Sequence, residues 1–156
     1  LSGHDLPDGR IVPGDFLTLG GAYQDNRVVP YEGIVVSKFD KLAQTKFLGL
    51  VNAYIGNLPD GPRESKMEDF EYHLSETHFC WIGGFGPSDP FYYRVQSPVI
   101  FIEFDHHPGV FLTNTEALKF HVHTVVRTPN GNDYGIDLLR QHYRASHSSE
   151  VLDAQT

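Results

Sequence analysis

The hydrophobic pattern of this chain changes its period once, close to Thr77, and that change limits the folds open to it. Before Thr77, apolar residues recur every three or four positions, as they do along one face of a helix. After it, aromatic and β-branched residues form short runs with a period of two, separated by glycine and proline. We therefore expect one α+β domain, with its helices before its strands.

The helical part predicts a pair of helices. The first should begin after Asp40, which can cap it, and end near Gly56, with its apolar residues on one face: Ala43, Phe47, Leu50, Val51 and Tyr54. Residues 57–62 read as a turn, with Pro62 as the first residue of a second helix. The helical period then continues through Met67, Phe70, Leu74 and His78. The short connection suggests an antiparallel or steeply crossed pair.

The period-two runs predict an antiparallel β-meander with strands at residues 79–82, 91–96, 99–105 and 120–127. Residues 1–37 carry glycine, proline and aspartate at short intervals, so we expect an irregular arm with short extended pieces. After a turn at 128–133, Ile136, Leu139 and Tyr143 mark a C-terminal helix. The expected domain spans residues 1–147, followed by a frayed tail at 148–156.

Composition excludes several classes of partner. The 156 residues include 20 acidic and 12 basic side chains, for a net charge of −8, and the basic ones are scattered. Such a chain repels a phosphate backbone, so we expect no nucleic-acid partner. No apolar run is long enough to span a membrane, so a soluble chain is expected. The first residues lack the pattern of a signal peptide, and we expect that something precedes Leu1 or was removed.

Histidine is the residue type that points to a site. The chain has nine histidines, and six of them fall between residues 73 and 123: His73, His78, His106, His107, His121 and His123. Histidine is the commonest metal ligand in proteins. In a strand, His121 and His123 share a face with Arg127, and two imidazoles at this spacing can bind one metal ion.

Carboxylates occur at the same spacing in the preceding strand. Glu103 and Asp105 share one face, opposite the face of the aliphatic residues around them. If the two strands lie near each other, these carboxylates face the imidazoles. Nitrogen ligands favour Zn, Mn, Fe or Cu over Ca or Mg. A further ligand could come from His106, His78 or His107, and the alternative is a hydrogen-bonded polar cluster without metal.

Four other side chains are candidates for the site: Arg127 as a catalytic residue, and Arg94, Trp81 and Tyr93 for substrate binding. Arg94 and Arg127 could hold a carboxylate or phosphate of a small-molecule substrate, or else form structural salt bridges with Glu103 or Asp105. Trp81 and Tyr93 could line an apolar pocket, with core packing as the alternative. The single cysteine, Cys80, permits no internal disulfide.

Three long motifs, at residues 54–61, 91–106 and 121–143, resemble the signature of a domain-of-unknown-function family, the one numbered 3500. The resemblance runs from about Asp25 to Tyr143. It implies that this chain is the C-terminal half of a longer protein, whose helical N-terminal half carries further histidines. The alternatives are that the other half is a second chain, or that this chain is a short branch of the family. It also places seven residues in the family signature: His121, His123, Glu103, Asp105, His106, Arg94 and Arg127.

The function that these residues favour is that of a metal-dependent enzyme. A hydrolase would use Zn or Mn to activate water, with Glu103 or Asp105 accepting the proton. An oxidoreductase would use Fe or Cu with open coordination positions. The rival hypotheses are a non-catalytic module, whose histidines bind a structural metal or only one another, and one part of a larger assembly.

Overall fold

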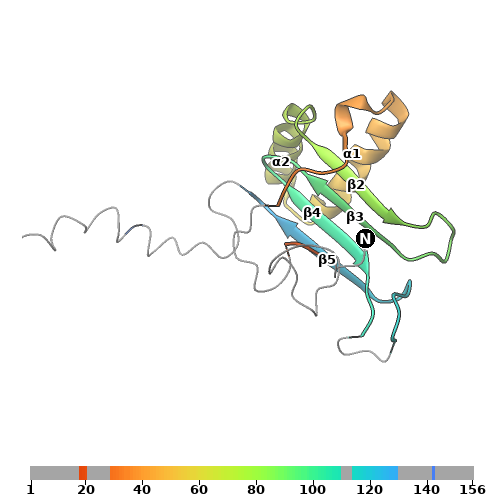
Figure 1. The fold of residues 1–156 in the computed structure, drawn as a ribbon. Coiled ribbons are helices and arrows are strands. Elements are labelled where there is room, and N and C mark those ends of the chain that lie inside the picture. Colours follow the sequence, from red (N-terminus) through yellow and green to blue (C-terminus); the bar gives the residue numbers. More distant parts are fainter. Residues whose placement is uncertain (1–17, 21–28, 110–113, 130–141, 143–156) are drawn as a thin grey trace, which may run out of the picture.

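A five-stranded antiparallel sheet with two helices on one side forms the fold of this chain (Figure 1). The computed structural model describes residues 18–20, 29–109, 114–129 and 142. The strand order is β1-β2-β3-β4-β5, each strand pairing with the next. The predicted α+β class and antiparallel meander are therefore confirmed. The strands are β1 (Ile34–Val35), β2 (His78–Gly83), β3 (Phe91–Gln96), β4 (Phe101–His106) and β5 (Val122–Arg127).

Helix α1 (Lys41–Ile55) has the bounds that its capping residues predict. The carboxylate of Asp40 accepts a hydrogen bond of 2.8 Å from the backbone N–H of Ala43, one of the first-turn donors that lack a partner within the helix. Gly56 follows the last helical residue as the C-cap. A short 3-10 turn, η2 (Val36–Lys38), leads into the helix from β1.

Helix α2 (Asp60–Tyr72) begins two residues earlier than expected, with Pro59 as its N-cap. Pro62 lies in the first turn, where a missing backbone N–H costs no helical hydrogen bond. The helix ends before His73, whose carbonyl accepts a 2.8 Å hydrogen bond from the Thr77 hydroxyl. His78 consequently opens β2 instead of continuing the helix, and its assignment to the helical stripe is wrong.

The strands β4 and β5 each begin two residues later than their hydrophobic runs predict, because the first residues of each run form a turn. Before β4, the Ser97 hydroxyl accepts hydrogen bonds from the backbone N–H groups of Val99 and Ile100, which folds them into a turn. Before β5, the backbone N–H of His121 donates to the carbonyl of Leu118. β3 has the predicted bounds, and the predicted residues 79–82 lie within β2.

Of the expected irregular arm, residues 18–20 and 29–37 are described, and the second segment contributes the two-residue edge strand β1. The expected C-terminal helix around Ile136, Leu139 and Tyr143, the domain boundary at 147 and the frayed tail lie outside the described residues. Within the described part of the chain, no helix is long and apolar enough to cross a membrane.

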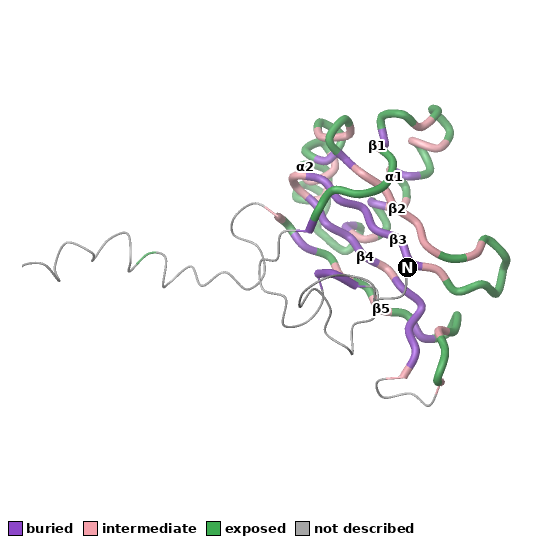
Figure 2. The backbone as a smooth tube through the Cα atoms, in the orientation of Figure 1, coloured by how far each residue is buried: buried purple, intermediate pink, exposed green. Residues whose placement is uncertain are grey.

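Most residues of β3 and β4 are buried (Figure 2), and the two faces of the sheet bury different kinds of side chain. Because directly paired residues of neighbouring strands point to the same side, the register sorts side chains into two sets. The helix-covered face packs against α1 and α2 and is apolar, with Tyr93, Val95, Ile102 and Phe104 from β3 and β4. The polar face carries Tyr92, Arg94, Glu103 and Asp105 from the same two strands.

Candidate metal centre

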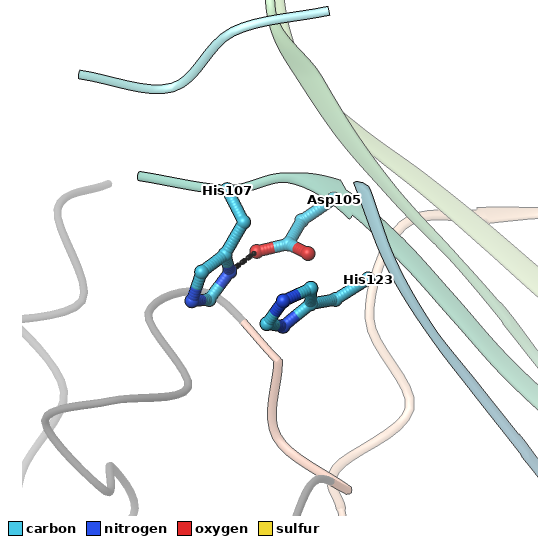
Figure 3. A group of neighbouring side chains, drawn as sticks. All are labelled: Asp105, His107 and His123. Carbon is cyan, nitrogen blue, oxygen red and sulfur yellow. Dashed lines mark hydrogen bonds and ion pairs between the residues drawn. The ribbon is translucent and has the colours of Figure 1, made fainter. Parts of the chain in front are cut away.

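Three potential metal ligands meet on the polar face, where β4 ends and β5 begins (Figure 3). Asp105, His107 and His123 each offer one ligand atom, and these atoms all lie within 4.8 Å of one another. Asp105 and His123 are direct cross-strand partners in the β4–β5 register. Together with His121, which adjoins His123, these residues are called the histidine cluster below.

Strand alternation explains how the cluster forms. Asp105 belongs to β4, and His107 follows two positions later in the chain, beyond the strand end, on the same side of the sheet. The backbone N–H of His107 donates a 2.7 Å hydrogen bond to the carbonyl of His121. This bond continues the β4–β5 pairing past the strand ends. Two residues from each segment are thereby brought together.

A buried hydrogen bond links His107 to Asp105. The His107 Nδ1 atom lies 2.7 Å from Asp105 Oδ2, and both side chains are almost fully buried. The other carboxylate oxygen, Asp105 Oδ1, is buried and receives no hydrogen bond from the residues that the structure describes. The His107 ring stacks on that of His123, with centroids 3.8 Å apart. Asp105 therefore keeps one oxygen available beside two imidazoles.

The imidazoles of His121 and His123 approach each other closely, with their Nε2 atoms 3.1 Å apart. Two ring nitrogens at this distance either share a hydrogen or flank a cation. With Zn–N bonds of about 2.0–2.1 Å, a 3.1 Å separation corresponds to an N–Zn–N angle of roughly 100°, close to tetrahedral. The pair thus has the spacing of two ligands of one metal ion.

Two histidines predicted as further ligands lie elsewhere. The ring of His106 is on the helix-covered face, in edge contact with Phe91 and Phe104, and its Nδ1 accepts a 3.0 Å hydrogen bond from the Phe91 N–H. Burial lowers the pKa of His106. His78 lies on β2 against Tyr31, two strands away from β4. His106 is separated from the cluster because neighbouring residues of a strand point to opposite faces. His78 is separated from it because β3 lies between β2 and β4.

Glu103, predicted as a catalytic base, has both carboxylate oxygens engaged in hydrogen bonds. One of its oxygens accepts hydrogen bonds from the Leu19 N–H (2.8 Å) and the Tyr92 hydroxyl (2.6 Å), and the other from the Gly20 N–H (2.7 Å). Burial raises the pKa of Glu103, and the hydrogen bonds that it accepts act in the opposite direction. Because both oxygens are engaged, this carboxylate holds the segment at residues 18–20 against the sheet.

The two arginines are not at the cluster either. Arg94 is buried and pairs with Glu32 at 2.7 Å, so its ion pair is structural, although the partner is neither Glu103 nor Asp105. The Arg127 guanidinium lies over the Phe101 ring, 5.5 Å from the centroid. Arg127 is four residues from His123, which is about 13 Å along a strand. Both predictions of a substrate-binding or catalytic arginine therefore lack support from the geometry.

Trp81 and Tyr93 pack into the aromatic layer of the helix-covered face, on the side of the sheet away from the cluster. Trp81 stacks on Phe91 with centroids 4.4 Å apart. The Tyr93 hydroxyl shares a hydrogen bond of 2.5 Å with the Tyr54 hydroxyl on α1. These contacts match the core-packing alternative and do not form a pocket wall beside the histidines.

Similarity to a known protein family extends over most of this chain. The model of DUF3500, described as a protein of unknown function, matches residues 10–136, which include every residue of the histidine cluster. The chain belongs to the DUF3500 family. Neither the curated proteins nor the solved structures gave a match.

The sequence pattern predicts Asp105, His121 and His123 as site residues, and in the structure His123 pairs with Asp105 across the strands and lies beside His121. The pattern gives His107 only as one of three options for a further ligand. The signal was present, because the alternation that pairs Glu103 with Asp105 reaches His107 two residues later. Asn114, which contacts His121, was not identified, and a single asparagine in a loop carries no recognisable spacing.

Proposed function

We propose that His107, His121 and His123 hold one transition-metal ion, and that the DUF3500 domain uses it as a metal-dependent hydrolase acting on a small-molecule substrate. The observation that carries the proposal is the 3.1 Å distance between the Nε2 atoms of His121 and His123. His107 supports it as the third imidazole, since it offers a ligand atom within 4.8 Å of the ligand atoms of His123 and Asp105.

The donor set favours certain metals. Imidazole nitrogens suit Zn, Mn, Fe and Cu, whereas Ca and Mg prefer sites made of oxygen. Three protein ligands are also the number found in catalytic zinc sites, which keep a fourth position for water, whereas structural sites use four. We therefore favour a catalytic metal over a purely structural one.

Asp105 supports hydrolysis over redox chemistry. A bound metal of this class lowers the pKa of water enough for it to act as a nucleophile near neutral pH. The Oδ2 atom of Asp105 orients His107, and Oδ1 is the carboxylate oxygen left to accept the proton of that water. In this proposal Asp105 takes the base role, since both oxygens of Glu103 are engaged elsewhere.

Elemental mass spectrometry on protein purified without an affinity tag or chelator tests the metal site. We expect near-stoichiometric Zn, Mn, Fe or Cu in the wild type and none in the double variant His121→Ala/His123→Ala. His78→Ala is the matched control, because it removes a histidine from the same sheet two strands away from β4. Absence of metal from wild-type protein that has also been incubated with each ion would overturn the proposal.

The hydrolytic step needs its own test. We expect the metal-loaded protein to cleave members of a panel of chromogenic carboxylic and phosphoric esters. Asp105→Asn keeps an oxygen that can accept from His107 but cannot take up a proton at neutral pH. It should retain the metal and lose at least 100-fold in kcat, within the range that a positioned base contributes. An unchanged kcat would remove Asp105 from the mechanism.

A further inference from the structure

Asn114 lies outside the histidine cluster and contacts two of its residues, His107 and His121. Its Nδ2 donates hydrogen bonds to the carbonyls of His107 (2.9 Å) and Glu116 (2.8 Å). Its Oδ1 lies 3.2 Å from the Nδ1 atom of His121. The backbone carbonyl of Asn114 separately accepts a 2.7 Å hydrogen bond from the Gly109 N–H. The main chain is therefore held independently of the side chain.

These contacts determine which way the amide points. An amide nitrogen only donates and an amide oxygen only accepts. Since two carbonyl oxygens surround one end of the Asn114 amide, that end must be the nitrogen, and turning the amide over would set oxygen against oxygen. The atom facing His121 is therefore the oxygen, an acceptor.

The orientation of Asn114 in turn sets the tautomer of His121. Facing an acceptor, Nδ1 of His121 must carry the hydrogen, so Nε2 of a neutral ring carries the lone pair. That lone pair lies on the atom 3.1 Å from Nε2 of His123. Asp105 does the same for His107, whose Nδ1 donates to the carboxylate and leaves Nε2 as the acceptor atom.

We propose that Asn114 is a positioning residue of the metal centre, which holds His121 in the tautomer whose Nε2 can bind the ion. The inference rests on the proposed function. In this arrangement two histidines of the cluster have a hydrogen-bond acceptor at Nδ1, the ring nitrogen that would not bind the metal. The acceptor is the Asp105 carboxylate for His107 and the Asn114 amide oxygen for His121. Outer partners of this kind orient the rings of metal-binding histidines, and their loss commonly weakens metal affinity 10- to 100-fold.

Two substitutions of Asn114 distinguish its proposed role in orienting His121 from a purely structural role, in which its side chain only holds the backbone at His107 and Glu116. Asn114→Ala removes the acceptor and both donated hydrogen bonds. Asn114→Asp keeps an oxygen toward His121 but can no longer donate to His107 or Glu116. We expect Zn²⁺ affinity, measured by competition with a chromogenic chelator, to fall 10- to 100-fold in Asn114→Ala and to stay within about threefold of wild type in Asn114→Asp. Equal losses in the two variants would overturn the proposal.

Nitrogen-15 NMR of the imidazoles in metal-free protein reads the tautomer directly. We expect His121 to carry its hydrogen on Nδ1 in wild type and in Asn114→Asp, and to populate both tautomers in Asn114→Ala. A wild-type His121 with its hydrogen on Nε2 would overturn the role of Asn114. This measurement needs no metal, so it distinguishes a failure of the positioning role from a failure of the proposed metal function.

Discussion

The helix-covered face buries aromatic and aliphatic side chains against α1 and α2, whereas the polar face buries charged and hydroxyl groups against residues 18–20 and 29–32. On the first face the stabilising contacts are non-directional and shared among many neighbours. On the second, each buried group depends on a particular partner, as Glu103 depends on the backbone of Leu19 and Gly20. One sheet thus separates its stabilising core from its chemistry.

The largest effect on stability should come from the helix-covered face. Phe70 on α2 is fully buried in the core, so Phe70→Ala removes a large side chain and leaves a cavity. We expect a loss of about 3–5 kcal/mol in the free energy of unfolding, measured by urea denaturation. The fraction that remains folded should bind Zn²⁺ as the wild type does. A loss below about 1 kcal/mol would mean that the core tolerates truncation there.

Metal bound on the polar face should stabilise the folded chain. A ligand that binds only the folded state, present at one hundred times its Kd, adds about 2.7 kcal/mol to the free energy of unfolding. Zn²⁺ should therefore raise the Tm of the wild type, a chelator should reverse the rise, and His123→Ala should show neither. An equal rise in His123→Ala would place the metal elsewhere in the chain.

Truncating the Glu103 side chain should cost somewhat less. Glu103→Ala leaves two buried backbone N–H groups and the Tyr92 hydroxyl without their acceptor, and we expect a loss of about 1–3 kcal/mol. Glu103→Gln keeps one oxygen acceptor and should cost less in the same denaturation experiment. Because the proposed base is Asp105, Glu103→Gln should also retain hydrolysis. Loss of activity at unchanged stability would restore Glu103 as a catalytic group.

The smallest effect concerns pH and the helix-covered face. Burial lowers the pKa of His106 in the folded state, while the unfolded chain titrates near the usual value of about 6.5. As pH falls below about 6.5, the unfolded state takes up a proton that the folded state does not, so stability decreases. His106→Gln keeps an acceptor for the Phe91 N–H but does not titrate. Its stability, followed by urea denaturation between pH 7 and 5, should decline less steeply than that of the wild type.

Local signals were enough for much of the fold. Asp40 and Gly56 predicted both ends of α1, and the alternation in residues 91–96 predicted β3. The errors arose where a side chain ended a pattern early. The Thr77 hydroxyl closes the turn after α2, so the helical period that seemed to reach His78 stops before it.

The candidate site was predictable only as far as strand alternation reached. Alternation placed Asp105 and His123 on matching faces, and the observed register makes them direct partners. It could not show that Glu103 is satisfied by Leu19, a residue 84 positions away in the chain. Such long-range partners depend on how an irregular segment crosses the sheet, and a period of two carries no information about that path.

β4 belongs to both faces at once, and five of its six residues are buried. The strand therefore offers no position where a change of side chain would meet only solvent. β5 differs, because Val122, Thr124 and Val126 are exposed while the residues between them are not. In a saturation-mutagenesis library, we expect substitutions to be poorly tolerated at every position of β4. Along β5, we expect tolerated and poorly tolerated positions to alternate. Chains that diverge while keeping this fold are expected to vary at those three positions long before they vary along β4.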